Sequence, residues 1–234
     1  MIKLRKSASR GFADHGWLKT YHTFSFADYY DPNFMGFGSL RVINDDYIDA
    51  KAGFPTHGHR NMEIITYLIE GAIEHRDSLN HSQVLRAGEV QVMTAGSGIY
   101  HSESNPLNEG NTHLLQIWVQ PNQLNLKPGY SQKSYLRELE YEQNLVLISS
   151  PDGRENSLKI NQNMEVYASR LKATREILFS MTRTGSKKAW IQLIKGNLKL
   201  NNLNIEEGDG VSIEDENEFK ISSITDSEFI LFVE

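Results

Sequence analysis

The chain contains no cysteine, and this absence removes several kinds of chemistry at once. Without thiols there is no disulfide, zinc finger, iron–sulfur cluster or thiolate nucleophile. A cysteine-free chain is compatible with the cytoplasm, which is the location we expect. No apolar run approaches about 18 residues, and the opening stretch Met-Ile-Lys-Leu-Arg-Lys-Ser lacks the apolar segment of a secretory signal. The sequence therefore predicts no membrane span and no secretory leader.

Positive charge is also scarce. The chain has 24 Lys and Arg against 30 Asp and Glu, for a net charge of −6. Residues 1–120 contain 10 of the basic and 13 of the acidic residues, so both halves share the acidic balance. A protein that binds nucleic acid carries a basic patch or tail to neutralise phosphates. We therefore expect neither a nucleic acid nor a membrane partner.

A sustained helical period is the third feature that the sequence lacks. Its short runs of β-branched, aromatic and polar residues are interrupted by Gly, Asn, Asp or Pro about every eight to twelve residues. The best helical candidate, Ser131–Tyr141, is short. The expected strand segments are residues 39–48, 63–75, 83–93, 113–120, 145–149 and 191–200. This texture predicts an all-β fold made of sandwiches or barrels, two of them in a chain of this length.

An internal similarity supports two barrels. Residues 65–71 form an apolar strand that ends in Gly, and Ala-Gly-Glu follows at 87–89 after a second strand. Residues 191–196 and 207–209 repeat this order. Two hairpins could share such a pattern by chance, so the pattern alone leaves duplication and coincidence both open.

The expected boundary lies near residues 121–131, which contain two prolines and one glycine. We expect one domain at residues 1–125 and a second at residues 126–234. All eight histidines fall at or before His113, so only the first domain has imidazoles to offer. The second would be a scaffold or an interaction surface.

Two pairs of metal-ligand side chains have the spacing that a strand requires. His57-Gly-His59 and His101-Ser-Glu103 are each i, i+2 pairs, and alternate side chains of a strand point to the same face. Three imidazoles and one carboxylate on one point would bind a single divalent transition metal. Four such ligands leave positions open on a five- or six-coordinate ion but close a tetrahedral zinc site. Because the set contains no sulfur, ligand type alone does not choose among iron, nickel, copper, manganese, cobalt and zinc.

The residues around these pairs resemble the two cupin motifs. Residues 53–63 with Gly71 resemble the first motif, and residues 88–101 resemble the second. Thr94 replaces the usual Pro of the second motif, and one extra residue precedes His101; both departures are shared with pirins. Three segments look like the pirin branch of cupins, namely residues 22–32, 66–78 and 91–104.

Similarity to the pirin family, strongest over residues 15–120, implies a bicupin fold and a close relation to the short bacterial pirins, some of which act as quercetin 2,3-dioxygenases. It implies His57, His59, His101 and Glu103 as metal ligands, and iron as the favoured metal. Generic cupins use the equivalent of Glu63 as a ligand. Here we expect Glu63 instead to orient one of the imidazoles.

The resemblance implies two functions of different classes. In the first, a flavonol such as quercetin binds the metal through its 3-oxygen, Glu103 accepts the 3-hydroxyl proton as a catalytic base, and ring cleavage releases carbon monoxide. In the second, as in eukaryotic pirins, the protein is a metal-dependent regulatory or protein-interaction module without a catalytic role. A purely structural bicupin with incidental metal is the third alternative. We expect a small barrel with room for one planar ligand, solvated side chains for His75 and His81 near a turn, and His22 either packed or lining the pocket.

Overall fold

The computed structural model describes residues 1–141 and 144–234 and is almost entirely β. Strands of the N-terminal half are β1 (Ile2–Arg5), β2 (Gly11–Asp14), β3 (Leu18–His22), β4 (Leu40–Ile48), β5 (Gly53–His59), β6 (Glu63–Glu70), β7 (Ala72–Asp77), β8 (Ser82–Arg86), β9 (Glu89–Thr94), β10 (Ile99–Ser104) and β11 (Thr112–Val119). Later strands are β12 (Gly129–Ser134), β13 (Val146–Ser150), β14 (Leu158–Lys159), β15 (Glu165–Leu171), β16 (Glu176–Ser180), β17 (Lys188–Lys195), β18 (Asn197–Leu200), β19 (Leu203–Glu206), β20 (Gly210–Glu214), β21 (Glu218–Ser223) and β22 (Ser227–Val233). The α-helix α1 (Leu136–Tyr141) and three 3₁₀ turns (Ser7–Ser9, Arg154–Asn156 and Met181–Arg183) complete the described elements.

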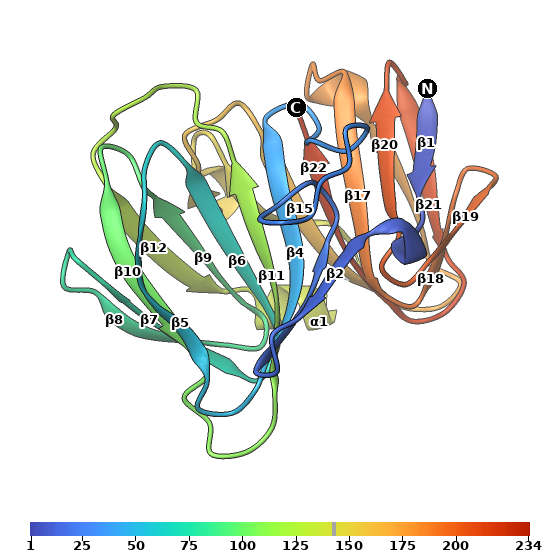
Figure 1. Cartoon of the computed structure of the whole chain (residues 1–234). Helices are drawn as coiled ribbons and strands as arrows, with labels where there is room; N and C mark the ends of the chain where they lie inside the picture. Colours follow the sequence, from blue (N-terminus) through green and yellow to red (C-terminus); the bar gives the residue numbers. More distant parts are fainter. Residues whose placement is uncertain (142–143) are drawn as a thin grey trace. The chain divides into compact units, whose positions relative to one another are not determined.

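The first compact unit, here called the first barrel, comprises residues 11–136 and 158–162. One of its sheets has the order β12-β9-β6-β11-β4-β3-β2, and the other has the order β5-β10-β7-β8. Figure 1 shows β9, β6, β11 and β4 side by side. The strand pairs of both sheets are antiparallel. Side chains of both sheets line one cavity, so the two sheets enclose a common interior.

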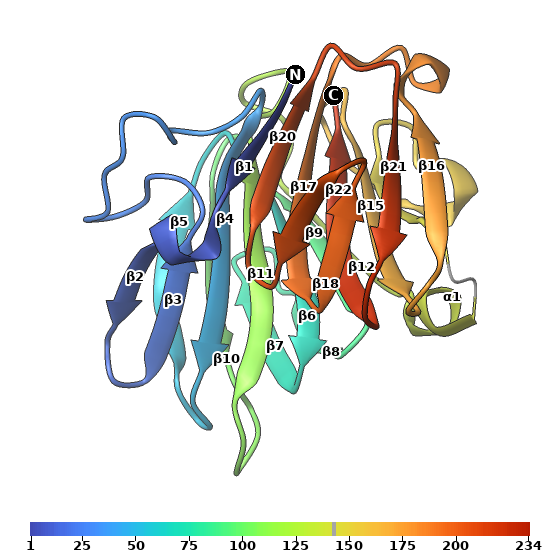
Figure 2. The same ribbon diagram turned by 90° about the vertical axis from the view of Figure 1, so that its right-hand side faces the viewer.

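The second compact unit, here called the second barrel, comprises residues 1–10, 137–157 and 163–234. Its larger sheet contains β1-β20-β17-β22-β15-β13 and its smaller sheet has the order β16-β21-β18-β19. Figure 2 shows β20, β17 and β22 next to one another. Strand β1 pairs with β20, so the first residues of the chain join the second unit. These units therefore differ from the division into residues 1–125 and 126–234 that the sequence suggested.

The repeated hairpin of the sequence appears in both units. Gly71 joins β6 to β7, and Gly196 joins β17 to β18, with φ angles of 81° and 88°. Side chains rarely adopt this left-handed conformation, and a Cβ at Gly71 would lie against the backbone of residues 111 and 112. Gly88 and Gly208 occupy the second pair of turns, with φ angles of 81° and 79°. The two units thus share a plan and not only a composition.

Polar side chains cross the interior of the first barrel in one line. Each is the direct cross-strand neighbour of the next, and we call this line the polar row. Its members, from β3 to β9, are His22, Asn44, Gln116, Thr66 and Gln91. Two small apolar clusters flank it, one containing Leu68 and Leu114 and the other containing Ile64 and Met93. Because residues two apart on a strand share a face, the row and both clusters face the same interior.

The corresponding line in the second barrel is apolar, and we call it the apolar row. It runs from β1 to β13 through Leu4, Val211, Ile191, Leu231, Tyr167 and Leu147. All six belong to one continuous hydrophobic core or pack against it. The second interior is therefore filled by side chains.

Two local expectations need adjustment. The helix expected at residues 131–141 begins only at Leu136, because residues 129–134 form β12, which pairs with β9 of the first barrel. Part of the expected linker is thus a strand of the first unit.

No helix within residues 1–141 and 144–234 has the length and apolar character that a membrane crossing requires.

Candidate metal centre

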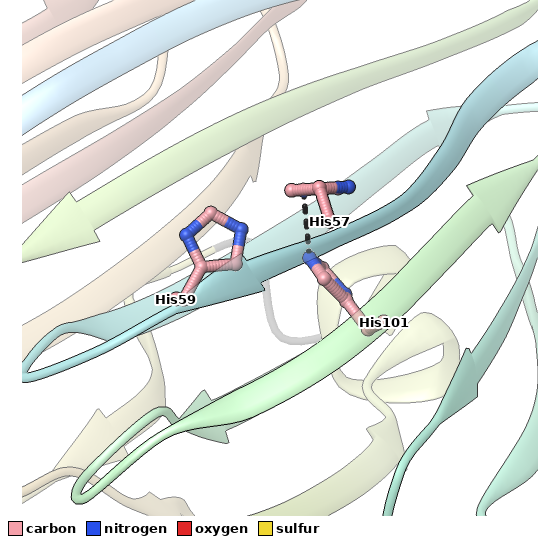
Figure 3. Close-up of side chains that lie close together, drawn as sticks. All are labelled: His57, His59 and His101. Atoms are coloured by element: carbon pink, nitrogen blue, oxygen red, sulfur yellow. Dashed lines mark hydrogen bonds between the residues drawn. The ribbon is translucent and has the colours of Figure 1, made fainter.

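Three of the predicted ligands meet on the smaller sheet of the first barrel. His57 and His59 lie on β5, and His101 lies opposite His57 on the neighbouring strand β10. Their ligand nitrogens are all within 4.8 Å of one another. Figure 3 shows the three rings close together, two from β5 and one from β10, with the His57–His101 contact dashed. The i, i+2 spacing on β5 and the antiparallel register of β5 with β10 account for this convergence.

Gly53 allows these two strands to approach each other at their far end. A Cβ at Gly53 would collide with the carbonyl oxygen of Glu103. The pairing of β10 with β5 is also irregular between His101 and Glu103, so that Glu103 faces Phe54. The glycine that opens the first motif therefore has a steric role beside the irregular pairing.

The hydrogen-bond partners of the rings fix which nitrogens are free. The Nδ1 of His57 lies 2.9 Å from the carbonyl oxygen of Pro55, which can only accept, so this nitrogen carries the proton. His101 Nδ1 lies 3.4 Å from His75 Nδ1, and His75 Nε2 lies 3.1 Å from the Asp77 carboxylate. Because His75 must donate to Asp77, its Nδ1 accepts from His101. The Nε2 atoms of His57 and His101 are then both unprotonated.

These two Nε2 atoms are 3.1 Å apart, with lone pairs on both. Two unprotonated nitrogens at this distance repel each other unless a cation lies within reach of both. Imidazole nitrogens about 2.1 Å from one ion, at right angles, would be about 3.0 Å apart. The separation of the His57 and His101 nitrogens therefore fits a divalent transition metal, and the His59 ligand atom lies within 4.8 Å of both.

Electrostatics keeps His59 and His101 neutral. Burial, followed by the neighbouring rings of His57 and His59, lowers the pKa of His101 to about 2. Burial and the His57 ring lower the pKa of His59 to about 4. Neutral imidazoles are the form that binds metals, so these two ligands need lose no proton near neutral pH.

His75 is buried and not solvated, and in this respect the sequence-based expectation was wrong. Strand β7 extends to Asp77, so His75 lies inside a strand, opposite Glu103 of β10. Its ring is fully buried and stacks on Tyr130 at 4.6 Å. His81 is partly exposed and donates to the same Asp77 carboxylate at 2.8 Å. Asp77, His75 and His101 form a chain of the kind that orients a metal ligand from behind.

Glu103 is buried beside the triad but is grouped differently. Its ligand atoms lie within 4.8 Å of those of His75 and His101, so His101 belongs to both groups. Its two carboxylate oxygens accept hydrogen bonds from Gln91 Nε2 at 3.0 Å and from Gln116 Nε2 at 2.8 Å. We call these two amides the amide clamp. Burial outweighs them and raises the pKa of Glu103 to about 7.

Glu63 does not orient an imidazole, contrary to the expectation. Its carboxylate accepts from the Thr94 hydroxyl at 2.9 Å and from the backbone and side chain of Asn161 at 3.1 Å. On β6 the interior side chains are Ile64, Thr66 and their alternates, so Glu63 faces the opposite side of the sheet. A turn separates Glu63, the first residue of β6, from His57 and His59 on β5, so the alternation along β5 does not extend to Glu63.

A cavity of about 400 Å³ opens beside the triad, within the usual size range of small-molecule sites. Both sheets contribute to it. Its walls are His15, Leu18, Thr20, His22, Phe26, Ala27, Asn44, Asp46, Phe54, Pro55, His57, His59, Glu103, Gln116 and Trp118. Trp118 packs edge-on against both His59 and Phe26, at 4.9 and 5.3 Å between ring centres. The aromatic side chains give the cavity a flat apolar wall that suits a planar ligand.

The side chains that support Glu103 were not predicted from the sequence. Gln91, Gln116 and Thr66 belong to three strands that are far apart in sequence, and only the cross-strand register brings them into one row. The single signal in the sequence was that each of three otherwise apolar strands has a polar residue near its middle. A buried polar residue needs a partner, and that need points to a network.

Comparison with known proteins agrees with the geometry. The model of the family described as Pirin matches residues 3–119, which is half of the chain. A second family, described as the quercetinase C-terminal cupin domain, matches residues 147–233. The two barrels are thus cupin domains, as the sequence motifs implied for the first of them.

Relatives match over the full length. The quercetin 2,3-dioxygenase of Escherichia coli strain K12 is 47% identical over 232 residues, covering 99% of this chain and 98% of that protein. The crystal structure of YhhW from Escherichia coli has a TM-score of 0.94 and 46% identity, covering 100% of this chain and 97% of that one. A structure of bacterial pirin YhhW in complex with nickel(II) matches equally well, with a TM-score of 0.94, 46% identity and coverage of 100% and 98%.

Proposed function

The chain belongs to the pirin family, and we propose that it is a metal-dependent dioxygenase of flavonol-type substrates, an activity like that named for its quercetin 2,3-dioxygenase relative. The observation that carries the proposal is the gathering of the His57, His59 and His101 ligand nitrogens within 4.8 Å of one another, beside a cavity with aromatic walls. Such a site binds a metal at the edge of a space that accepts a planar molecule.

His57, His59, His101 and Glu103 would hold the ion. The three imidazoles are gathered, and the ligand atom of Glu103 lies within 4.8 Å of that of His101. Iron is the metal that we propose, while nickel, the ion in the related YhhW structure, also suits three nitrogens and one oxygen. When bound, the ion supplies a Lewis-acidic, redox-active position for the flavonol 3-oxygen and dioxygen.

Glu103 would act as the catalytic base. Burial raises its pKa to about 7, close to the pKa that suits a base working at neutral pH. The amide clamp leaves the carboxylate little freedom to rotate, because each oxygen is held by a different amide. Held in this way, the carboxylate can take the proton of a flavonol 3-hydroxyl without first reorganising.

The cavity walls would orient the flavonol. Phe26, Phe54 and Trp118 offer apolar contacts to a planar ring system, and a ring system bound between them would displace water from beside the metal ligands. No residue of the second barrel has a part in this proposal, and its apolar core leaves it a scaffold or an interaction surface.

Oxygen consumption by iron-loaded protein with quercetin, together with carbon monoxide release, tests the proposal. We expect steady turnover by the wild type and one bound ion per chain by elemental analysis. His101→Ala should keep its fold but lose most of its metal and its activity. A matched control is His113→Gln, because His113 lies outside the triad and pairs with Asp45 at 2.7 Å. If the fully loaded wild type consumes no oxygen with quercetin, the regulatory alternative replaces the oxygenase.

A further inference from the structure

Two polar side chains of the cavity remain unused by the proposed chemistry. Thr20 on β3 and Asp46 on β4 are direct cross-strand neighbours, and both line the cavity. They belong to the larger sheet of the first barrel, whereas the histidine triad belongs to the smaller one. Each is only 3% exposed. The cavity therefore has polar groups on a wall that the metal ligands do not form.

These two side chains lack the hydrogen bonds that their neighbours make. The Oδ1 of Asp46 and the Oγ1 of Thr20 are buried without a hydrogen-bond partner in the part of the chain that the structure describes. The Thr20 hydroxyl is near enough to favour the ionised Asp46 carboxyl, but the two atoms do not reach hydrogen-bonding geometry. By contrast, His22 and Asn44 lie two residues away along the same strands, and their Nδ1 and Oδ1 atoms form a hydrogen bond of 2.8 Å.

A structural role does not account for this carboxyl. Burial first, and then the charges of Asp45 and Glu103, raise the pKa of Asp46 to about 7. The fold would gain stability from an apolar residue at this position, because an unsatisfied buried carboxyl costs free energy. A ligand hydroxyl that entered the cavity would supply the missing partner. Carboxyl and hydroxyl together can both accept from and donate to such a group.

We propose that Asp46 and Thr20 form a hydroxyl-binding subsite that selects polyhydroxylated flavonols over flavonols that carry only the 3-hydroxyl. The inference rests on the proposed function and names the substrate class of the same site. The aromatic side chains contact the ring system without regard to its hydroxyls, so they cannot make this distinction. A site built to hydrogen-bond a hydroxyl discriminates against the analogue that lacks it, because its own polar groups are then left unpaired.

Three flavonols and two isosteric variants test the subsite. Quercetin has hydroxyls on both outer rings, galangin keeps only those of the fused ring, and 3-hydroxyflavone has neither set. For wild-type protein we expect kcat/KM to fall roughly 10- to 100-fold from quercetin to 3-hydroxyflavone, the range of one or two hydrogen bonds to a charged group. The position of galangin in this series identifies the ring that the subsite holds.

Asp46→Asn should lower kcat/KM for quercetin about 10-fold and leave that for 3-hydroxyflavone unchanged. Thr20→Val should act in the same direction with a smaller effect. Titration calorimetry of the metal-free protein with quercetin and 3-hydroxyflavone gives a second readout that does not depend on turnover. Asp49→Asn is the matched control, because Asp49 is an exposed carboxyl just after β4 that lies outside the cavity walls.

Each outcome distinguishes the inference from the proposed function. If Asp46→Asn and Thr20→Val both keep the wild-type ratio between quercetin and 3-hydroxyflavone, the subsite does not exist, although the oxygenase stands. An equal loss for all three flavonols would mean that Asp46 affects the reacting centre, which also overturns the subsite. If the wild type neither binds nor turns over any flavonol, the proposed function and the inference fail together. Circular dichroism of each variant establishes that it is folded.

Discussion

The two barrels place opposite chemistry at the same point of a shared plan. Thr66 lies five residues before the turn glycine Gly71, and Ile191 lies five residues before Gly196. Each faces its barrel's interior, and each is the cross-strand partner of a central strand residue, Gln116 in the first barrel and Leu231 in the second. The same interior positions are thus polar in the first barrel and apolar in the second, although the two barrels share one plan.

This difference shows that the fold alone does not make the site. A fully buried Leu or Ile contributes about 1.5–3 kcal/mol to folding, whereas a buried amide contributes little beyond its hydrogen bonds. The interior side chains of the second barrel pack against one another. The equivalent positions of the first barrel hold Glu103 and keep a cavity open. Substitutions should therefore affect chemistry in the first barrel and stability in the second.

The largest expected effect concerns Glu103. Glu103→Gln keeps the size and one oxygen that can bind metal but removes the basic carboxylate. We expect turnover of quercetin per bound metal to fall roughly 10²- to 10⁴-fold, the usual span of a general base. Steady-state oxygen consumption, normalised to metal content by elemental analysis, measures this.

Metal content should fall much less than turnover in this variant. A variant with full activity per bound ion would show that Glu103 is only a ligand, and the base mechanism would then be wrong. Glu89→Gln is a suitable control for handling and charge, because this residue bonds Gln132 on the β9–β12 edge and lies outside the cavity walls.

The second barrel should respond in the opposite manner. Leu231 is fully buried at the centre of the apolar row. Leu231→Ala should lower the free energy of unfolding by about 2–5 kcal/mol, because it leaves a cavity in a packed core. Denaturant titration measures the loss, and metal affinity of the folded protein should not change. A change in metal affinity as large as that in stability would mean that the two interiors do not work independently.

Sequence patterns predicted those site residues that lie in pairs close together along the chain. His57, His59 and His101 followed from the i, i+2 rule and the flanking motifs, and the all-β fold followed from the spacing of turn residues. Glu103 remains a proposal as a ligand, since the structure groups it with His75 and His101.

The errors have physical causes in turns and in register. The expectation for Glu63 failed because the turn after His59 places this residue on another strand, where it bonds Thr94. His75 was assigned to a turn because nothing local shows that β7 continues to Asp77. Strand β1 joins a barrel whose other strands begin more than a hundred residues later, and no local pattern predicts such a pairing.

A third prediction tests the chain of groups behind His101. His75→Phe retains a ring that can stack on Tyr130 but removes the acceptor for His101 Nδ1. We expect metal affinity to fall about 10- to 100-fold, the effect of losing a group that orients a ligand. His81→Phe is the matched control, because His81 bonds the same Asp77 without contacting His101. Equal losses in both variants, measured by titration calorimetry, would assign the effect to Asp77 instead.

The smallest expected effect is a displacement along the pH axis. Burial raises the pKa of Glu103 to about 7 in the metal-free protein, and a protonated carboxyl cannot bind metal. Metal affinity should therefore be greatest above pH 7 and fall as the pH drops through that value. His59 and His101, with pKa values of about 4 and 2, add nothing to this fall until far lower pH.

Thr66 sharpens this last measurement. Its hydroxyl accepts from Gln91 at 2.9 Å and donates to Gln116 at 3.1 Å, so it aligns both amides of the clamp. The Thr66 hydroxyl also favours the ionised form of Glu103.

Thr66→Val removes this hydroxyl, so the pKa of Glu103 should rise and the fall in metal affinity should begin at higher pH. At neutral pH we expect a loss of about 1 kcal/mol in metal binding, or roughly five-fold. Affinities measured by calorimetry from pH 5 to 9, at roughly one-unit intervals chosen to bracket that pKa, would show the displacement. A profile that coincides with that of the wild type would mean that the two amides hold Glu103 without help from Thr66. Of the polar row, only Gln91 and Gln116 would then influence the carboxylate.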